Sequence, residues 1–282
     1  MARNCVNTSD RVVTTTSLGN QEKWFNAESN LWYKVDGNKF EALSEAVASE
    51  ILREHTNAQS LPEISVAKYW IEQGNVRGQK SVFSVSENFK KPDNSIVTVN
   101  TILQNTLGKD YIAQFNRRAS LKERMQYLVE TVERSTHMDG FGEYLATLFE
   151  IDALILNQDR HLNNIAVIST PCGYKPCPVF DNGASFLLDI GCFRLDVDTK
   201  SYISQARALP FKSSFVRSVH TAQELYGVHL KVDFTQSAVE LIANKFLQYY
   251  PPQLSAYLKE RIVTVLMIQQ KKLYSSITPP KR

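Results

Sequence analysis

The sequence lacks the features that mark several large classes of protein. Its 282 residues include too few cysteines for a disulfide framework, namely Cys5, Cys172, Cys177 and Cys192. The first residues lack the apolar core of a secretion signal. We therefore expect a reducing, cytoplasmic environment, with secretion into a host by a signal-independent route left open. The most apolar stretch, residues 145–156, contains two acids and is too short to span a bilayer, so no membrane segment is predicted.

Charge and glycine usage narrow the functional classes further. The 32 Lys+Arg and 29 Asp+Glu leave a formal net charge of +3, which is too small to indicate a membrane-surface or nucleic-acid partner. The chain has neither a GxGxxG nor a GxxxxGK[ST] motif, so a Rossmann or Walker nucleotide site is not predicted. With 43% hydrophobic and 22% charged residues, the chain is instead long enough for one large domain or two lobes.

The first ninety residues are predicted to form mainly strands. Runs of β-branched and aromatic residues predict strands over residues 11–17, 31–35, 64–71 and 79–85. Between them, residues 40–52 keep the apolar period of an amphipathic helix. This part of the chain should therefore form a small sheet with one helix.

After the turn-rich residues 90–94, the pattern becomes mainly helical. Helices are expected over residues 97–115, 120–136 and 140–157, and in several segments from 212 to 275. Residues 164–169 and 178–180 are expected to be strands joined by a hairpin-like loop. We predict an α+β, bilobal, protein-kinase-like fold, with a small β-rich N-lobe over residues 1–90 and a mainly helical C-lobe over residues 91–282.

Two acid-bearing segments at the ends of the predicted hairpin carry the candidate chemistry. Asp159 lies five positions before Asn164, the spacing of a phosphotransferase catalytic loop. A carboxylate there can orient or deprotonate an acceptor hydroxyl, and an amide oxygen can hold Mg²⁺ on nucleotide phosphates. Asp181 follows an apolar run and precedes a glycine at position 183, as a second magnesium ligand would. Each segment alone is also a plain turn signature, but their order favours the phosphotransferase hypothesis.

A lysine in the first half fits the same chemistry. Lys34 lies in the apolar run Leu-Trp-Tyr-Lys-Val, where a charge is costly unless it has a partner. Phosphates and a helix carboxylate would be such partners. Glu45 is the expected carboxylate, with Glu41 and Glu50 as rivals. The alternative is an edge-strand lysine that points to water.

Five blocks of sequence, taken together, resemble the HipA-like serine/threonine kinases, which include the toxin kinases of persistence modules and the shorter CtkA-type members. The blocks are residues 19–23, 32–34, 86–89, 159–164 and 178–183, and they occur in the family's order. The resemblance extends from residue 14 to residue 190 or so. It implies a protein kinase that uses ATP and Mg²⁺.

The resemblance also implies a role for each matched residue. The residues over the ATP phosphates would be Ser17, Gly19, Asn20, Lys23 and Lys34, with Glu45 holding Lys34. Glu87 and Phe89 would form the adenine hinge through backbone contacts. The catalytic loop would supply Asp159 and a supporting His161, and Mg²⁺ would be held by Asn164 and Asp181.

Regulation and partners follow from the same resemblance. HipA-like kinases phosphorylate a hydroxyl in their own phosphate loop, and the matching candidates here are Thr16 and Ser17. The substrate would be a protein with a serine or threonine acceptor. An antitoxin, or a small protein that replaces the family's extra N-terminal subdomain, would be a partner, and direct nucleic-acid binding is not expected. The alternatives are a lipid or small-molecule kinase and a nucleotide-binding pseudokinase scaffold.

Overall fold

The structure is a computed structural model that describes residues 22–37 and 39–277. The strand predicted over residues 11–17 lies outside the described residues, as do four candidate site residues: Thr16, Ser17, Gly19 and Asn20. Among the described residues, no helix is both long enough and apolar enough to cross a bilayer.

An antiparallel sheet forms the first part of the described chain. Its strands, in spatial order, are β1 (Lys23–Asn26), β2 (Leu31–Val35), β4 (Gln79–Glu87) and β3 (Tyr69–Val76). β2 has the predicted bounds, and β4 extends the predicted strand by two residues. The strand predicted over residues 64–71 was placed too early, because residues 64–68 run beside Val179 instead: Val179 N donates to Ser65 O at 2.7 Å.

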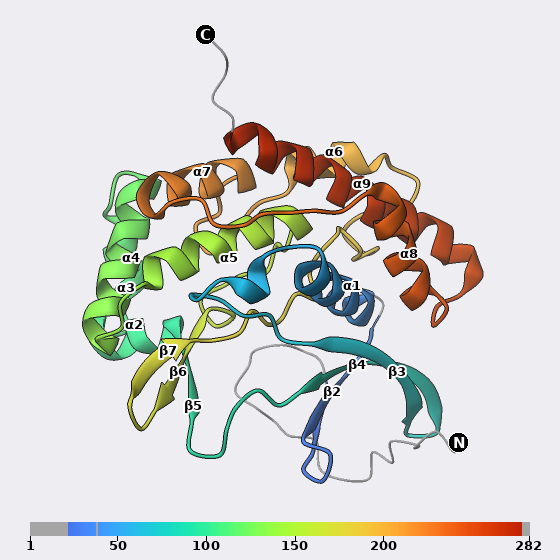
Figure 1. Ribbon diagram of the computed structural model, residues 1–282, viewed down its shortest axis with the longest axis horizontal. Helices are drawn as coiled ribbons and strands as arrows, with labels where there is room; N and C mark the ends of the chain where they lie inside the picture. The colour runs from blue at the N-terminus through green and yellow to red at the C-terminus, as the bar shows by residue number, and fades with distance from the viewer. Residues whose placement is uncertain (1–21, 38, 278–282) are drawn as a thin grey trace.

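Helix α1 (Glu41–Glu54) matches the predicted amphipathic helix and lies between the sheet and the helical part of the chain (Figure 1). It contacts β3 and β4 on one side and α8 (Gln236–Leu247) on the other. Residues 42–49 are all buried as a result. The main hydrophobic core therefore runs through α1 into the helical part. The division into lobes at residue 90 stays a prediction.

The helix predicted over residues 97–115 is wrong in two places. Residues 95–98 form strand β5 (Ser95–Thr98), and two helices follow it, α2 (Val99–Leu107) and α3 (Tyr111–Asn116). Thr98 starts α2 because its hydroxyl accepts a hydrogen bond from Thr101 N at 3.1 Å. Gly108 ends α2 with φ at 80°, a conformation that glycine adopts without strain.

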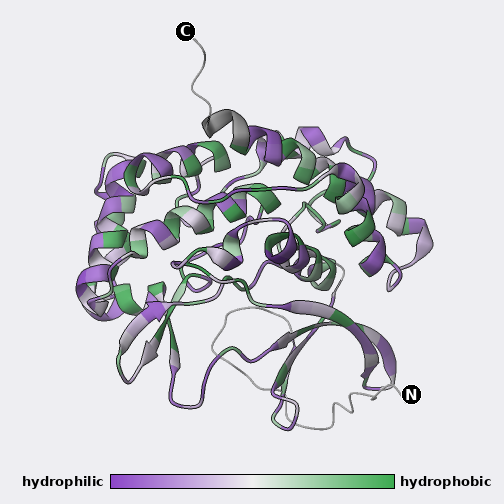
Figure 2. Cartoon of the chain, in the orientation of Figure 1, coloured by the Kyte–Doolittle hydropathy of each residue, from purple (hydrophilic) through white to green (hydrophobic). Residues whose placement is uncertain are grey.

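The predicted helices over residues 120–136 and 140–157 are present as α4 (Leu121–Thr136) and α5 (Phe141–Ile155). α5 is the central helix, buried except at Glu143 and packed against α4, α7 (Phe215–Tyr226) and α9 (Pro252–Ile277). In Figure 2, hydrophobic and hydrophilic residues alternate along the outer helices α4 and α7, as amphipathic helices require. The short helix α6 (Thr199–Gln205) was not predicted.

A second sheet has the order β5-β6-β7, with β6 (Ala166–Thr170) and β7 (Gly173–Pro176). A hairpin is present as predicted, but its returning strand was placed too late: the chain turns directly after Thr170 and pairs back from Gly173, inside the predicted hairpin-like loop. Gly173 has φ at 123°, which permits this tight return. Residues 178–180 make only an isolated parallel bridge, from Val179 to Val66, before the chain reaches Asp181.

Candidate active site

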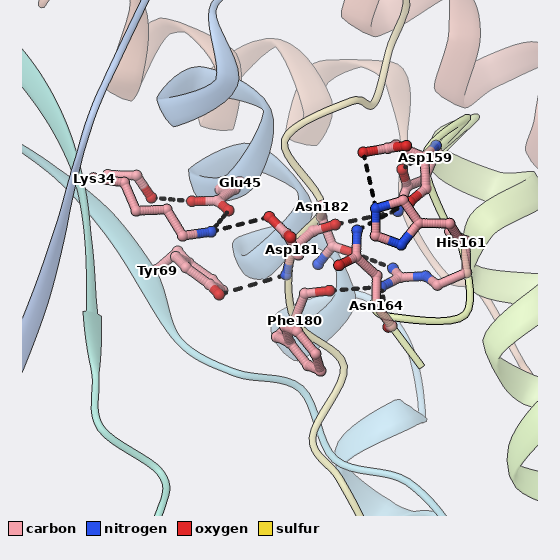
Figure 3. A network of polar contacts seen from close by, with 12 residues as sticks. Lys34, Glu45, Tyr69, Asp159, His161, Asn164, Phe180, Asp181 and Asn182 are labelled. Carbon is pink, nitrogen blue, oxygen red and sulfur yellow. Dashed lines mark hydrogen bonds and ion pairs between the residues drawn. The ribbon is translucent and has the colours of Figure 1, made fainter. Parts of the chain in front are cut away.

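Three charged side chains from distant parts of the sequence meet between the sheet and α1 (Figure 3). Lys34 Nζ donates to Glu45 Oε1 at 2.7 Å and to Asp181 Oδ1 at 3.0 Å. The Lys34 side chain is only 13% exposed, and β2 is an inner strand, so the alternative of an edge lysine that points to water is wrong. Of the rival carboxylates, Glu50 pairs with Lys245.

The three charges stabilise one another's ionised forms. Burial alone would lower the pKa of Lys34, but the carboxylates of Asp181 and Glu45 hold this pKa well above its usual value. Burial alone would raise the pKa of Asp181, yet the ammonium group of Lys34 and then that of Lys23 hold it at about 2. Asp181 is therefore a carboxylate at neutral pH.

Lys23 lies directly opposite Lys34 in the register of β1 and β2. Like charges opposite each other in a sheet repel. Burial, and then the neighbouring Lys34, lower the pKa of Lys23, while Asp181 and Glu45 oppose that shift. A phosphate group bound here would relieve the repulsion between the two ammonium groups.

Asp159 lies in the loop that follows α5, and the loop's own amides fix its backbone. Asn157 Oδ1 accepts from Asp159 N at 3.2 Å, and Asn164 Nδ2 donates to Asp159 O at 3.0 Å. The Asp159 side chain is 57% exposed, with His161 Nε2 at 3.8 Å from its Oδ2. Partial burial raises the pKa of Asp159, His161 opposes the rise, and the Asp181 carboxylate adds to it. Asp159 is thus an accessible carboxylate on a rigid loop.

A buried arginine, to which the sequence analysis gave no role, ties this loop to the Asp181 segment. Arg160 binds the Asp152 carboxylate through Nε and an Nη at 3.0–3.1 Å. Its other terminal nitrogen donates to Phe180 O at 2.6 Å and to Asn164 O at 3.1 Å. The sequence feature that could have indicated this role is Asp152. It is an acid in the most apolar stretch of the chain, and a buried acid requires a buried partner.

The backbone of Asp181 is held in an uncommon conformation. Its φ is 58°, in the left-handed region that residues other than glycine rarely occupy. Asp181 N donates to the Tyr69 hydroxyl at 3.5 Å, and Asn157 Nδ2 donates to Asp181 O at 3.4 Å. A Cβ on Gly183 would lie 3.2 Å from Glu41 Cβ, so the glycine lets this segment approach α1 closely. These contacts direct the Asp181 carboxylate toward Lys34.

The expected adenine hinge lies at the end of β4. Glu87 is exposed there, and the next residue, Asn88, donates its N–H to Asn30 O at 3.0 Å. The ring of Phe89 lies 6.1 Å from that of Phe180, one residue before Asp181. Both rings pack on a small apolar cluster formed by Ala166, Ile168 and Cys177. The hinge roles of Glu87 and Phe89 stay predictions.

The residues present fit a magnesium ion. The Asn164 side chain uses Nδ2 in a hydrogen bond and Asp181 uses Oδ1, so Asn164 Oδ1 and Asp181 Oδ2 carry no hydrogen bond from the described residues. Neutral and anionic oxygens are the ligands that Mg²⁺ prefers, usually one or two side chains together with phosphate oxygens. Within residues 22–37 and 39–277, no group of three or more His, Cys, Asp or Glu side chains could hold a metal.

Comparisons with known proteins bear on the fold. No protein-family model matches the chain, and no curated protein matches its sequence. Among solved structures, the proinflammatory kinase CtkA of Helicobacter pylori is 13% identical, with a TM-score of 0.60 over 93% of this chain and 91% of that one. The chain therefore has a kinase-like fold. More particularly, the fold is similar to that of CtkA, which confirms, for the fold, the resemblance to short, CtkA-type kinases.

Two weaker likenesses complete the comparison. HipA of Shewanella oneidensis, in a complex with HipB and operator DNA, gives a TM-score of 0.45 at 13% identity over 91% of this chain and 64% of that one. A microcompartment-associated aminopropanol kinase gives 0.29 at 12% identity over 94% and 92%. Neither likeness is close enough to carry an argument. The predicted site roles and the expected partners stay predictions.

Proposed function

We propose that this protein transfers the γ-phosphoryl group of ATP to a serine or threonine hydroxyl of another protein. The observation that supports this most is the meeting of the Lys34, Glu45 and Asp181 charges with an accessible Asp159 on a loop fastened to the same segment. Phosphoryl transfer depends on positioning and on stabilising charge, with little covalent chemistry by the protein. This arrangement supplies both.

Each group has a distinct task in the proposal. Lys34, held by Glu45, and Lys23 bind the phosphates. Asp159 accepts a hydrogen bond from the acceptor hydroxyl and takes its proton as the phosphoryl group transfers. Asn164 and Asp181 hold the magnesium ion, which when bound neutralises charge on the phosphate oxygens. Reaction at Asp159 needs no covalent intermediate on the enzyme.

A protein acceptor is favoured over a small molecule by the surroundings of Asp159. The Asp159 side chain is 57% exposed and lines a hollow of about 390 Å³. Small-molecule sites usually bury most of their ligand's surface, whereas the Asp159 side chain is more than half exposed. An exposed carboxylate can instead be approached by a hydroxyl on a large, folded or extended chain.

The test is incubation of the purified protein with MgCl₂ and γ-labelled ATP. Casein, myelin basic protein and a cell lysate serve as protein acceptors, with phosphoinositide vesicles and amino alcohols as non-protein acceptors. We expect label on serine or threonine of protein, and none with Asp181→Asn. The matched control is Asp196→Asn, because Asp196 is an exposed acid that, among the described residues, forms an ion pair with Arg194 alone.

Other outcomes contradict the proposal in different ways. Label that appears only in vesicles or amino alcohols would replace the protein substrate with a small one. ATP binding by calorimetry without label in any acceptor would indicate a nucleotide-binding scaffold. Equal labelling by the Asp181→Asn variant would remove the proposed site altogether.

A further inference from the structure

A cavity of about 560 Å³ opens beside the catalytic loop, outside the group of charges described above. Its walls come from segments far apart in the sequence: α2, α3, α4, the loop residues 161–163 and the segment 209–212. This volume is within the range typical of ligand pockets, about 300–1,000 Å³. None of the residues with a task in the proposed phosphoryl transfer is among the described residues that line this cavity.

The walls of the cavity are held in place by contacts of their own. The segment that carries Pro210 and Phe211 is closed by Ala208 N, which donates to Ser213 O at 2.8 Å, and the Phe211 ring lies edge-on to Phe149 at 6.2 Å. Elsewhere in the wall, the Phe115 ring packs against Tyr127 at 5.2 Å. The cavity is therefore preformed and partly apolar.

The charged side chains that line the cavity are basic. Arg124 and Lys212 line it, and among the described residues that line it none is acidic. Arg124 Nε donates to Arg118 O at 3.3 Å, while its two terminal nitrogens, like Lys212 Nζ, have no hydrogen bond or ion pair with the described residues. The hollow at Asp159 differs, since Glu41 and Asp189 line it together with Lys39. An anionic group therefore finds complementary charge at Arg124 and Lys212.

The cavity adjoins the reaction centre through His161. His161 lines it, and His161 Nε2 lies 3.8 Å from Asp159 Oδ2. An extended chain advances about 3.3–3.6 Å per residue, so a segment whose hydroxyl lies at Asp159 reaches the cavity within a few residues. Ile112, on the cavity wall and 59% exposed, gives such a segment an apolar surface to contact.

We propose that this cavity is the specificity pocket for the protein substrate: it binds an acidic residue next to a bulky apolar side chain, a few positions from the phosphorylated serine or threonine. The carboxylate binds Arg124 and Lys212, and the apolar side chain packs between Phe115 and Phe211. The assignment rests on the proposed kinase function. It adds to that function the chemical class of the substrate segment, which is acidic and apolar.

A binding measurement tests the pocket without any phosphoryl transfer. The probe is a fluorescein-labelled peptide, Asp-Glu-Phe-Asp-Glu, followed by fluorescence anisotropy. We expect the Arg124→Gln, Lys212→Gln double variant to weaken binding about tenfold or more, because hydrogen bonds to charged groups are the strong ones. The matched control is Arg134→Gln, Lys200→Gln, which removes the same charge from exposed positions of α4 and α6 that do not line the cavity. Equal weakening by both double variants, or no binding by the unaltered protein, would overturn the assignment.

A kinetic measurement separates this assignment from the proposed function. Peptides with one central serine, and with each residue type fixed in turn at the flanking positions, are incubated with ATP and Mg²⁺. We expect a preference for acidic residues that the Arg124→Gln, Lys212→Gln variant loses while KM for ATP stays the same. If the unaltered protein phosphorylates peptides without that preference, the pocket assignment is wrong and the kinase function stands. Transfer to no peptide by the unaltered protein contradicts the kinase function and, with it, the pocket.

Discussion

Two pairs of charged residues at the catalytic loop and the Asp181 segment differ in how completely they are enclosed. Arg160 and Asp152 have side chains only 1% and 3% exposed. Asp181 and Asp159 have side chains 29% and 57% exposed. The first pair is surrounded by protein partners, whereas the second keeps oxygens accessible to a ligand.

The residues that hold the catalytic loop in place are therefore distinct from the acids that remain accessible for a reaction. The nitrogens of Arg160 are satisfied by Asp152, Asn182 and backbone oxygens, so nothing remains with which to bind a substrate. Asp159 has its backbone fixed and its carboxylate open. The enclosed pair therefore positions the loop, and the open acids are the groups available for chemistry.

The largest expected effect is on the enclosed pair. Arg160→Met leaves the Asp152 carboxylate buried without its partner, which should cost about 3–5 kcal/mol of the free energy of unfolding. Urea denaturation followed by circular dichroism measures the loss. The double variant Arg160→Met, Asp152→Leu should regain much of it, because both charges are gone. A loss no greater than that of Arg194→Met, at an exposed pair, would show that the enclosed pair does not support the loop.

At the exposed acid Asp159 we expect a loss of activity without a loss of stability. Asp159→Asn should lower the rate of phosphoryl transfer by about 10²–10⁴, the usual contribution of a positioned general base, and leave the midpoint of thermal unfolding unchanged. The two readouts are a γ-labelled ATP assay and differential scanning calorimetry. A variant that unfolds at a lower temperature would place Asp159 among the supporting residues, and one with full activity would remove it from the reaction.

A smaller effect, on ATP binding, is expected at Lys34, which is nearly enclosed and contacts the Asp181 carboxylate. Lys34→Met should weaken the affinity for ATP about tenfold, because one charge-assisted contact to the phosphates is lost. Isothermal titration calorimetry with ATP and Mg²⁺ measures the affinity. The control, Lys122→Met, removes a half-exposed lysine paired with Glu224 on the far helices. Unchanged ATP affinity in Lys34→Met would show that Lys34 serves the Glu45 and Asp181 carboxylates alone.

The smallest effect concerns two acids at the start of α1. Burial, and then the neighbouring Asp36, raise the pKa of Glu41 to about 7, and burial raises that of Asp36 to about 6 although the Tyr250 hydroxyl donates to it at 2.6 Å. Since both pKa values are higher in the folded state than in the unfolded chain, the folded state is favoured by protonation. Its extra stability is complete below pH 4 or so and is lost as the pH rises through 6 and 7.

We therefore expect the melting temperature to fall by a few degrees between about pH 5 and pH 8, and to fall less in Glu41→Gln. Calorimetry across that range, with Glu224→Gln as an exposed control, measures the difference. A melting temperature of Glu41→Gln that follows the unaltered protein at every pH would show that Glu41 does not carry the dependence.

Several elements follow from local sequence alone. The bounds of β2 and α4 agree with prediction because alternation and helical periodicity are properties of neighbouring residues. The strand β7 was not predicted, because a strand this short is defined by its pairing partner. The end of α2 was not predicted either, because a single glycine at position 108 marks it. The position of residues 64–68 was also missed, because Val179, far along the chain, determines their pairing.

The candidate site divides in the same way. The sequence by itself determined the residue types and their order: a lysine in an apolar strand, an acid and an amide five positions apart, and an acid before a glycine. The tertiary structure alone decided that Lys34 pairs with Glu45 and Asp181, and that Arg160 fastens the loop to the Asp181 segment. It also formed the pocket at Arg124 and Lys212. The physical reason is that periodicity depends on residues within a turn or two, whereas ion pairs and cavities depend on which buried surfaces pack together across the whole chain.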